Sequence, residues 1–130
     1  MACILVVDDE VDVGEAIQRV LEQAGFVVTV TSGVAQGLKV LETGVPDVVV
    51  TDMIMPKVNG LEFIKVLRSR FPKVRIVAIS GGGNPIAYKP DAVATHAYLA
   101  AARAAGAEEI LTKPFDMDDL LAAVRRQLLN

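Results

Sequence analysis

The sequence predicts an α/β fold, a doubly wound parallel sheet of five strands with helices on both faces. Three observations lead to this prediction. Strand and helix signals alternate five times along the 130 residues. The strand-like runs are continuously apolar and rich in β-branched residues, as in strands that are covered on both faces. Polar residues end these runs, and this places candidate functional groups along one edge of the sheet.

The first half of the chain contains three strand signals and two helix signals. The strands are expected at Cys3–Val7, Val27–Thr31 and Val48–Thr51. A helix from Val11 to Ala24 carries apolar residues at the spacing of one face, and Gly25 follows as its C-terminal stop. The second helix is shorter and ends near Gly44; its apolar positions are Val34, Leu38 and Leu41.

The second half continues the alternation. A third helix, with Leu61, Ile64 and Leu67 on its apolar face, precedes a strand at Ile76–Ile79. An Ala-rich fourth helix ends at Gly106, and a short fifth strand follows at Ile110–Thr112. Asp116 is the expected N-cap of the last helix, whose apolar stripe consists of Met117, Leu120, Leu121, Val124 and Leu128.

Five such units make a (βα)5 pattern with right-handed crossovers. This pattern fits the flavodoxin-like strand order 2-1-3-4-5, in which the strand order reverses between strands one and three. Ligands bind at this switch point, outside the carboxyl ends of the strands. We therefore expect a functional site where the first and third strands end.

Composition limits the function classes. Hydrophobic residues make up 52 % of the chain, which argues against disorder, yet no apolar stretch reaches the roughly 20 residues of a membrane span. A net charge of −3 argues against direct nucleic-acid binding.

The single cysteine permits no internal disulfide, so we expect a cytoplasmic protein. Cys3 itself is expected to be a core thiol at the start of the first strand.

Three aspartates stand where strands end. Asp8 and Asp9 follow the first strand, and Asp52 follows the third. If these strands are neighbours, the three carboxylates converge and repel one another unless a cation neutralises them. Mg²⁺ suits such a site, because a few carboxylates hold it while other coordination positions remain for phosphate oxygens. Asp52 could then act both as a ligand and as a nucleophile toward a phosphoryl group.

Two more polar residues end strands at the same edge. Ser80 closes the fourth strand and could donate a hydrogen bond, and Lys113 closes the fifth and could neutralise a transferred anion. Each residue alone has an ordinary explanation: Asp8 or Asp9 could cap a helix, and Lys113 could be a solvated lysine. Their joint placement at one edge favours a phosphoryl-transfer site.

Four motifs follow one another along the chain: Val7-Asp8-Asp9-Glu10, Thr51-Asp52-Met53-Ile54-Met55-Pro56 with Gly60, Ser80, and Lys113-Pro114-Phe115. Together they resemble the signature of bacterial two-component response-regulator receiver domains, and the resemblance covers residues 1–130. It implies that Asp52 accepts a phosphoryl group from a sensor histidine kinase or a histidine phosphotransfer protein. Asp8, Asp9, Asp52 and the main-chain carbonyl of Ile54 would hold Mg²⁺, and Ser80 and Lys113 would contact the phosphoryl oxygens.

The resemblance further implies a signalling domain, not a turnover enzyme, that acts on a downstream protein through its fourth helix and fifth strand. Receivers commonly carry Tyr or Phe three positions before the lysine as part of the switch, and Ile110 stands there instead. The segment from Ser80 to Lys113 is longer than in most receivers by about three helical turns. Because the chain ends with its last helix, we expect either a stand-alone receiver or a piece of a longer regulator.

Other functions remain open. A phosphatase of the haloacid-dehalogenase type also uses a strand-end aspartate and Mg²⁺, but it expects a second Asp where Ile54 stands. A degenerate receiver that serves only as a binding module would not need the full set of polar residues. A flavin-binding module would have few aromatic residues with which to stack on the flavin, since the chain has no Trp and two Tyr.

Overall fold

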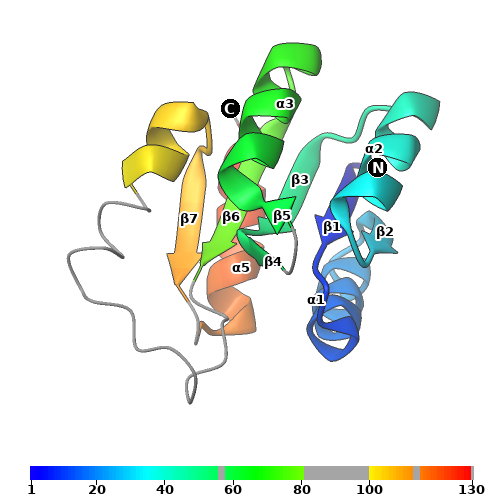
Figure 1. The fold of residues 1–130 in the computed structure, drawn as a ribbon. Helices are drawn as coiled ribbons and strands as arrows, with labels where there is room; N and C mark the ends of the chain where they lie inside the picture. Colours follow the sequence, from blue (N-terminus) through cyan, green and yellow to red (C-terminus); the bar gives the residue numbers. More distant parts are fainter. Residues whose placement is uncertain (56–57, 81–99, 113–114, 130) are drawn as a thin grey trace.

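Parallel strands form the centre of the fold (Figure 1). The computed structural model describes residues 1–55, 58–80, 100–112 and 115–129, with the main chain alone at residues 54, 55, 58 and 80. The strands of the main sheet are β1 (Cys3–Val7), β2 (Val27–Thr31), β3 (Val48–Asp52), β6 (Arg75–Ser80) and β7 (Glu109–Thr112). Their order is β2-β1-β3-β6-β7 and every pairing is parallel. This confirms the predicted order 2-1-3-4-5, with the reversal between β1 and β3.

Helices cover both faces of this sheet. They are α1 (Val11–Gln23), α2 (Val34–Thr43), α3 (Gly60–Arg70) and α5 (Met117–Leu129), and residues 100–105 are also helical. In Figure 1, α2 and α3 lie in front of the sheet while α1 and α5 lie behind it. The predicted stop of α1 is confirmed, since Gly25 adopts a φ of 97°, which is accessible to glycine at little cost. Within the described residues, no helix is long and apolar enough to cross a membrane.

The alternation of side chains along the strands divides the core into two clusters. Strand residues that point to one face, such as Ile4, Val6 and Val50, pack with helix residues such as Ile17 of α1 and Leu120 of α5. Strand residues that point to the other face, such as Leu5, Val7 and Val49, pack with Leu41 of α2, Phe63 of α3 and Ala102 of the helix at residues 100–105. Because the central residues of β1, β3 and β6 are buried on both faces, the sequence there is continuously apolar rather than alternating.

The end of the sheet where the strands begin is held by a polar network around Arg68. Its guanidinium donates to the carbonyl of Gly106 at 2.7 Å and to a carboxylate oxygen of Glu108 at 2.6 Å. The other carboxylate oxygen of Glu108 accepts from the N–H of Ile76 at 2.6 Å. Since Arg68 belongs to α3 and Glu108 precedes β7, this network fixes the start of β7 against α3 and β6.

Several strand and helix ends differ from the predicted ones by one residue, and two larger features also differ from the sequence-based predictions. A second, two-stranded sheet, β4 (Ile54–Met55) paired antiparallel with β5 (Val58–Asn59), lies between β3 and α3 and was not predicted. The prediction that Cys3 is a core thiol was wrong, because Cys3 is exposed. The next residue, Ile4, is already covered by the helices and is 1 % exposed.

Candidate functional site

Asp8 and Asp9 are positioned by the end of β1. The N–H of Asp8 donates to the carbonyl of Thr31 at 3.1 Å, so the residue continues the contact with β2 beyond the strand itself. One carboxylate oxygen of Asp8 accepts from the N–H of Glu10 at 2.9 Å, and this bond turns the chain toward α1. Asp8 therefore orders the turn before α1, although Glu10 occupies the N-cap position and makes no side-chain cap bond. Asp8 is buried, while Asp9 is more exposed.

Asp52 is the last residue of β3, one residue further than the predicted end of this strand. It lies opposite Ile79 of β6 in the ladder, and its carbonyl accepts from the hydroxyl of Thr51 at 3.0 Å. The next residue, Met53, donates its N–H to the carbonyl of Ile79 at 2.8 Å, so the main chain is fixed on both sides of Asp52. The side chain of Asp52 is 1 % exposed.

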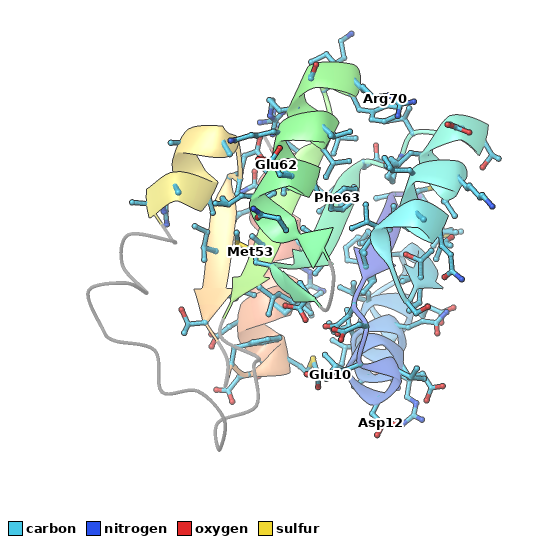
Figure 2. The ribbon with its side chains drawn as sticks, in the orientation of Figure 1. Glu10, Asp12, Met53, Glu62, Phe63 and Arg70 are labelled. Carbon is cyan, nitrogen blue, oxygen red and sulfur yellow. The ribbon has the colours of Figure 1, made fainter. Side chains whose placement is uncertain are left out.

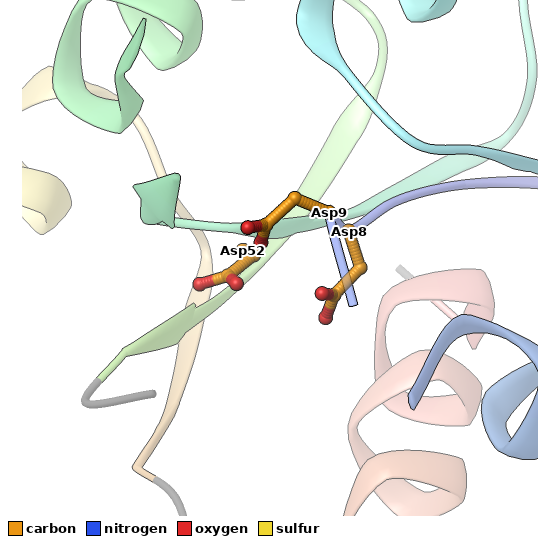
Figure 3. Close-up of side chains that lie close together, drawn as sticks. All are labelled: Asp8, Asp9 and Asp52. Atoms are coloured by element: carbon orange, nitrogen blue, oxygen red, sulfur yellow. The ribbon is translucent and has the colours of Figure 1, made fainter. Parts of the chain in front are cut away.

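These strand ends bring the three carboxylates together (Figure 3). Asp8, Asp9 and Asp52 each offer a carboxylate oxygen that lies within 4.8 Å of the oxygens of the other two. Like charges at this separation, two of them buried, repel strongly in a medium less polar than water. Three hard oxygen donors at this spacing match the preference of Mg²⁺, so the residues present fit this ion.

The chain below Asp52 is packed against the start of α3. Met53 and Phe63, labelled in Figure 2, are both buried. Gly60, the first residue of α3, lies against the main chain of Met53. A Cβ at Gly60 would stand 2.4 Å from the carbonyl oxygen of Met53, closer than any real contact. Only glycine allows α3 to begin so close to the strand that carries Asp52.

The structure describes the remaining predicted site residues only in part. Ser80 is the last residue of β6 and pairs with Thr112 of β7, so its main chain lies at the same edge as Asp52. Lys113 directly follows Thr112 but lies outside the described residues, as does Pro114. Ile54 lies two residues beyond Asp52 in β4, opposite Asn59. The structure thus brings the three aspartates together, and for Ser80 and Ile54 it describes the main chain alone.

Ile110, the residue that replaces the usual aromatic, is partly buried in β7 and packs against the cluster under α2 and α3. It lies opposite Ala78 of β6, toward the middle of the strand. Most of the predicted fourth helix and the Gly-rich segment after Ser80 lie outside the described residues, and only residues 100–105 of the helix are described.

Sequence reasoning missed two contributors to the site. One is the close approach of Gly60 to Met53, which no local pattern reveals because it depends on the tertiary path of the chain. The other is the β4–β5 pair. Its strands have only two residues each, the second of them contains the polar Asn59, and Pro56-Lys57 is not a common hairpin turn sequence, so the pair gave no clear signal.

Comparison with known families gives one match over most of the chain. The model described as "Response regulator receiver domain" matches residues 4–125. Among individual proteins, the probable transcriptional regulatory protein SilR of Salmonella typhimurium is 34 % identical over 96 % of this chain and 50 % of its own length. The acid tolerance regulatory protein ActR of Rhizobium meliloti is 33 % identical over 93 % of this chain and 57 % of its own length. The chain thus spans about half the length of the curated relatives it matches.

Solved structures give the same result. A response regulator receiver domain protein from Clostridium thermocellum is 31 % identical and superposes with a TM-score of 0.79, over 98 % of this chain and 94 % of that one. The chemotaxis response regulator CheY4 of Vibrio cholerae is 26 % identical, with a TM-score of 0.79 and 98 % coverage of both chains. Sequence and structure therefore agree on one family.

Proposed function

The chain belongs to the family of response regulator receiver domains, and from this premise we propose that residues 1–130 form a receiver that accepts a phosphoryl group on Asp52. The observation that supports this choice is the convergence of Asp8, Asp9 and Asp52 at the switch point of the sheet. Asp52 alone among them ends a strand buried on both faces, so its carboxylate is held in place while Asp9 remains nearer to solvent.

In the transfer step, a carboxylate oxygen of Asp52 attacks the phosphorus of a phosphohistidine on the donor protein. The new O–P bond forms as the N–P bond breaks, and the imidazole of the donor departs with the electron pair and takes up a proton. The fixed main chain around Asp52 keeps the nucleophile in position, and positioning accounts for much of the rate of phosphoryl transfer. Ser80 and Lys113 would contact the phosphoryl oxygens, in accordance with the family motifs.

Asp8, Asp9, Asp52 and the main-chain carbonyl of Ile54 would hold Mg²⁺. Bound there, the ion would neutralise the negative charge that builds up when a phosphoryl group approaches three carboxylates. The carboxylates would supply some of its oxygen ligands, and the phosphoryl oxygens would take further coordination positions. We expect weak binding of Mg²⁺ in the unphosphorylated protein, because the phosphoryl oxygens complete its coordination.

The domain is a signalling module in our proposal, not a turnover enzyme. Its donor is a sensor histidine kinase or a histidine phosphotransfer protein, and its output is a protein target reached through the fourth helix and β7. Ile110 offers no aromatic ring to swing, so the switch operates mainly through Ser80 and the segment that follows it. We assign no direct nucleic-acid binding to this domain, no membrane association and a cytoplasmic location, although relatives that are twice as long are named transcriptional regulators.

The test uses acetyl phosphate as a small phosphodonor and intact mass as the readout. Wild type with Mg²⁺ should gain one phosphoryl group, and EDTA should abolish the gain. Asp52→Asn should gain none, whereas Asp12→Asn, the same substitution at an aspartate in the first turn of α1, should behave as wild type. A wild-type yield in Asp52→Asn, or unchanged phosphorylation in EDTA, contradicts the assignment. Beryllofluoride binding separates an active receiver from a degenerate one, which would not bind it.

Hydrogen exchange with and without beryllofluoride tests the switch. The change in protection should be largest between residues 80 and 105 and small in α2. Uniform protection, or a change confined to α2, would count against a switch that operates through Ser80.

A further inference from the structure

Thr51 interrupts the apolar sequence of β3 one residue before the proposed phosphoacceptor. A strand that is buried on both faces needs apolar residues, and the three valines from Val48 to Val50 meet this requirement. Thr51 is 0 % exposed, yet it carries a hydroxyl. Valine has nearly the same shape and would fit the pattern, so burial alone does not account for a threonine here. Departures from such a local pattern are concentrated at functional sites.

The hydroxyl of Thr51 acts on the main chain of Asp52. Side chains alternate along a strand, and Val49, two residues earlier, packs in the cluster under α2 and α3, so Thr51 points to the same face. Its hydroxyl donates to the carbonyl of Asp52 at 3.0 Å. This bond satisfies a hydroxyl that would destabilise the fold if it were buried without a partner.

The peptide group that follows Asp52 is thus held at both of its ends. Its oxygen is the carbonyl oxygen of Asp52, which accepts from Thr51. Its N–H belongs to Met53 and donates to the carbonyl of Ile79 at 2.8 Å. Because a peptide group is planar, the two bonds together fix its orientation. Since β3 fixes the chain before Asp52, the direction of the Cα–Cβ bond of Asp52 is also fixed, and this bond aims the carboxylate.

The bond from Thr51 lies where the pairing of β1 with β3 ends. Val7 with Thr51 is the last pair of this ladder, and the N–H of the next residue, Asp8, donates to the carbonyl of Thr31 at the end of β2. The N–H and C=O of a trans peptide group point in opposite directions, so the carbonyl of Asp52 faces away from β6, toward the side of β1. A side-chain hydroxyl therefore supplies a donor to this carbonyl beyond the last pair of strand residues.

We propose that Thr51 is a positioning residue for phosphoryl transfer: its hydroxyl orients the peptide group after Asp52 and so aims the Asp52 carboxylate at the incoming phosphorus. This inference rests on the proposed role of Asp52. Positioning of the nucleophile accounts for much of the rate of phosphoryl transfer. Because the hydroxyl acts on the main chain, its loss should slow the transfer step and leave the binding of the phosphodonor unchanged.

Two substitutions separate positioning from stability. Thr51→Val removes the hydroxyl and keeps the shape, whereas Thr51→Ser keeps the hydroxyl and removes a buried methyl group. With acetyl phosphate and Mg²⁺, Thr51→Val should lower the maximal rate of phosphorylation about three- to tenfold, the range for one hydrogen bond, at an unchanged half-saturating donor concentration. Thr51→Ser should be phosphorylated at nearly the wild-type rate, although the lost methyl group lowers its urea midpoint.

Thr43→Val is the matched control for the lost hydroxyl. Thr43 lies at the end of α2, and its hydroxyl also donates to a main-chain carbonyl, that of Val40, at 2.8 Å. This variant should be phosphorylated at the wild-type rate. An unchanged rate in Thr51→Val, or equal losses of rate in Thr51→Val and Thr51→Ser, would overturn the proposal.

Hydrogen exchange of the Met53 amide tests the restraint without phosphorylation. Relative to the amide of Val50 in the same strand, the Met53 amide should exchange several-fold faster in Thr51→Val and at the wild-type ratio in Thr51→Ser. An unchanged ratio in Thr51→Val would refute the role of Thr51 even if Asp52 is the phosphoacceptor. If wild type gained no phosphoryl group, the proposed function would be wrong, and the exchange ratio would still decide whether Thr51 orients this peptide group.

Discussion

Replacing Gly60 with alanine should damage both the stability of the protein and its phosphorylation, although the added group is a single methyl. Gly60 is buried at the first position of α3. Its new Cβ would lie 2.4 Å from the carbonyl oxygen, 2.5 Å from the Cα and 2.8 Å from the carbonyl carbon of Met53. All three are main-chain atoms, so no side-chain rotation can relieve the overlap.

The magnitude follows from two opposing effects. Overpacking of a core costs about 1–3 kcal/mol, and a main-chain neighbour places this case toward the upper end. Alanine is a better helix former than glycine and offsets up to about 1 kcal/mol. The net loss is then about 2 kcal/mol, which a domain with a free energy of unfolding of about 5–15 kcal/mol survives. Moving α3 away from Met53 also shifts Asp52, so phosphorylation by acetyl phosphate should be slower.

Urea denaturation measures the free energy of unfolding, and intact mass follows the rate of phosphorylation. Gly44→Ala is the matched control, because nothing lies within 4 Å of a Cβ there and its φ of 175° is open to any residue. This control should keep its stability or gain up to about 1 kcal/mol, since alanine restricts the unfolded chain. If Gly60→Ala were as stable as Gly44→Ala, the close approach of α3 to Met53 would not constrain the fold as argued.

Three further expectations concern charge and the lifetime of the phosphorylated state. Asp9→Ala should lose phosphorylation yet melt at an equal or higher temperature without Mg²⁺, because one of three repelling carboxylates is gone; a marked fall in melting temperature would contradict the repulsion. Ile54→Asn should speed loss of the phosphoryl group several-fold once the donor is removed, since an amide two residues after Asp52 can position the attacking water, and unchanged decay would assign that task to another group. For Glu109, burial acts to raise the pKa, but hydrogen bonds from Arg126 and Gln127 hold the pKa below its ordinary value of 4.5. Its carboxylate thus stabilises the native state above this pH and ceases to do so as the pH falls through the lowered pKa. Wild type should therefore exceed Glu109→Gln in urea midpoint at pH 7, and the gap should close under acid; a gap independent of pH would refute this account.

The strands and the sheet order could be predicted from the sequence because a strand that is buried on both faces needs an apolar residue at every position. A strand such as β3 has no solvent-facing side, so every position from Val48 to Val50 must be apolar. The ends of these strands could also be predicted, because the polar residues Asp8 and Asp52 come after the apolar runs. Right-handed crossover connections then left few topologies, and the convergence of the aspartates followed from the topology.

The features that were missed depend on contacts between segments far apart in the sequence. The exposure of Cys3 depends on how far the helices extend over β1. The apolar pattern of the strand alone does not show this. The bond between Gln127 and Glu109 joins two elements whose relative register is set by core packing. The same holds for Gly60: the motif includes this glycine, but the close approach to Met53 that requires it depends on the tertiary path of the chain.

The exposure of Cys3 has a practical consequence. It is the only thiol in the chain, and it stands where β1 begins, beside Asp47 and away from Asp52. A maleimide fluorophore would therefore attach at one known position without any engineered substitution. Such a label would sit at the end of the sheet opposite to the aspartates, so it would report on this end of the domain while the acidic residues remain chemically unaltered.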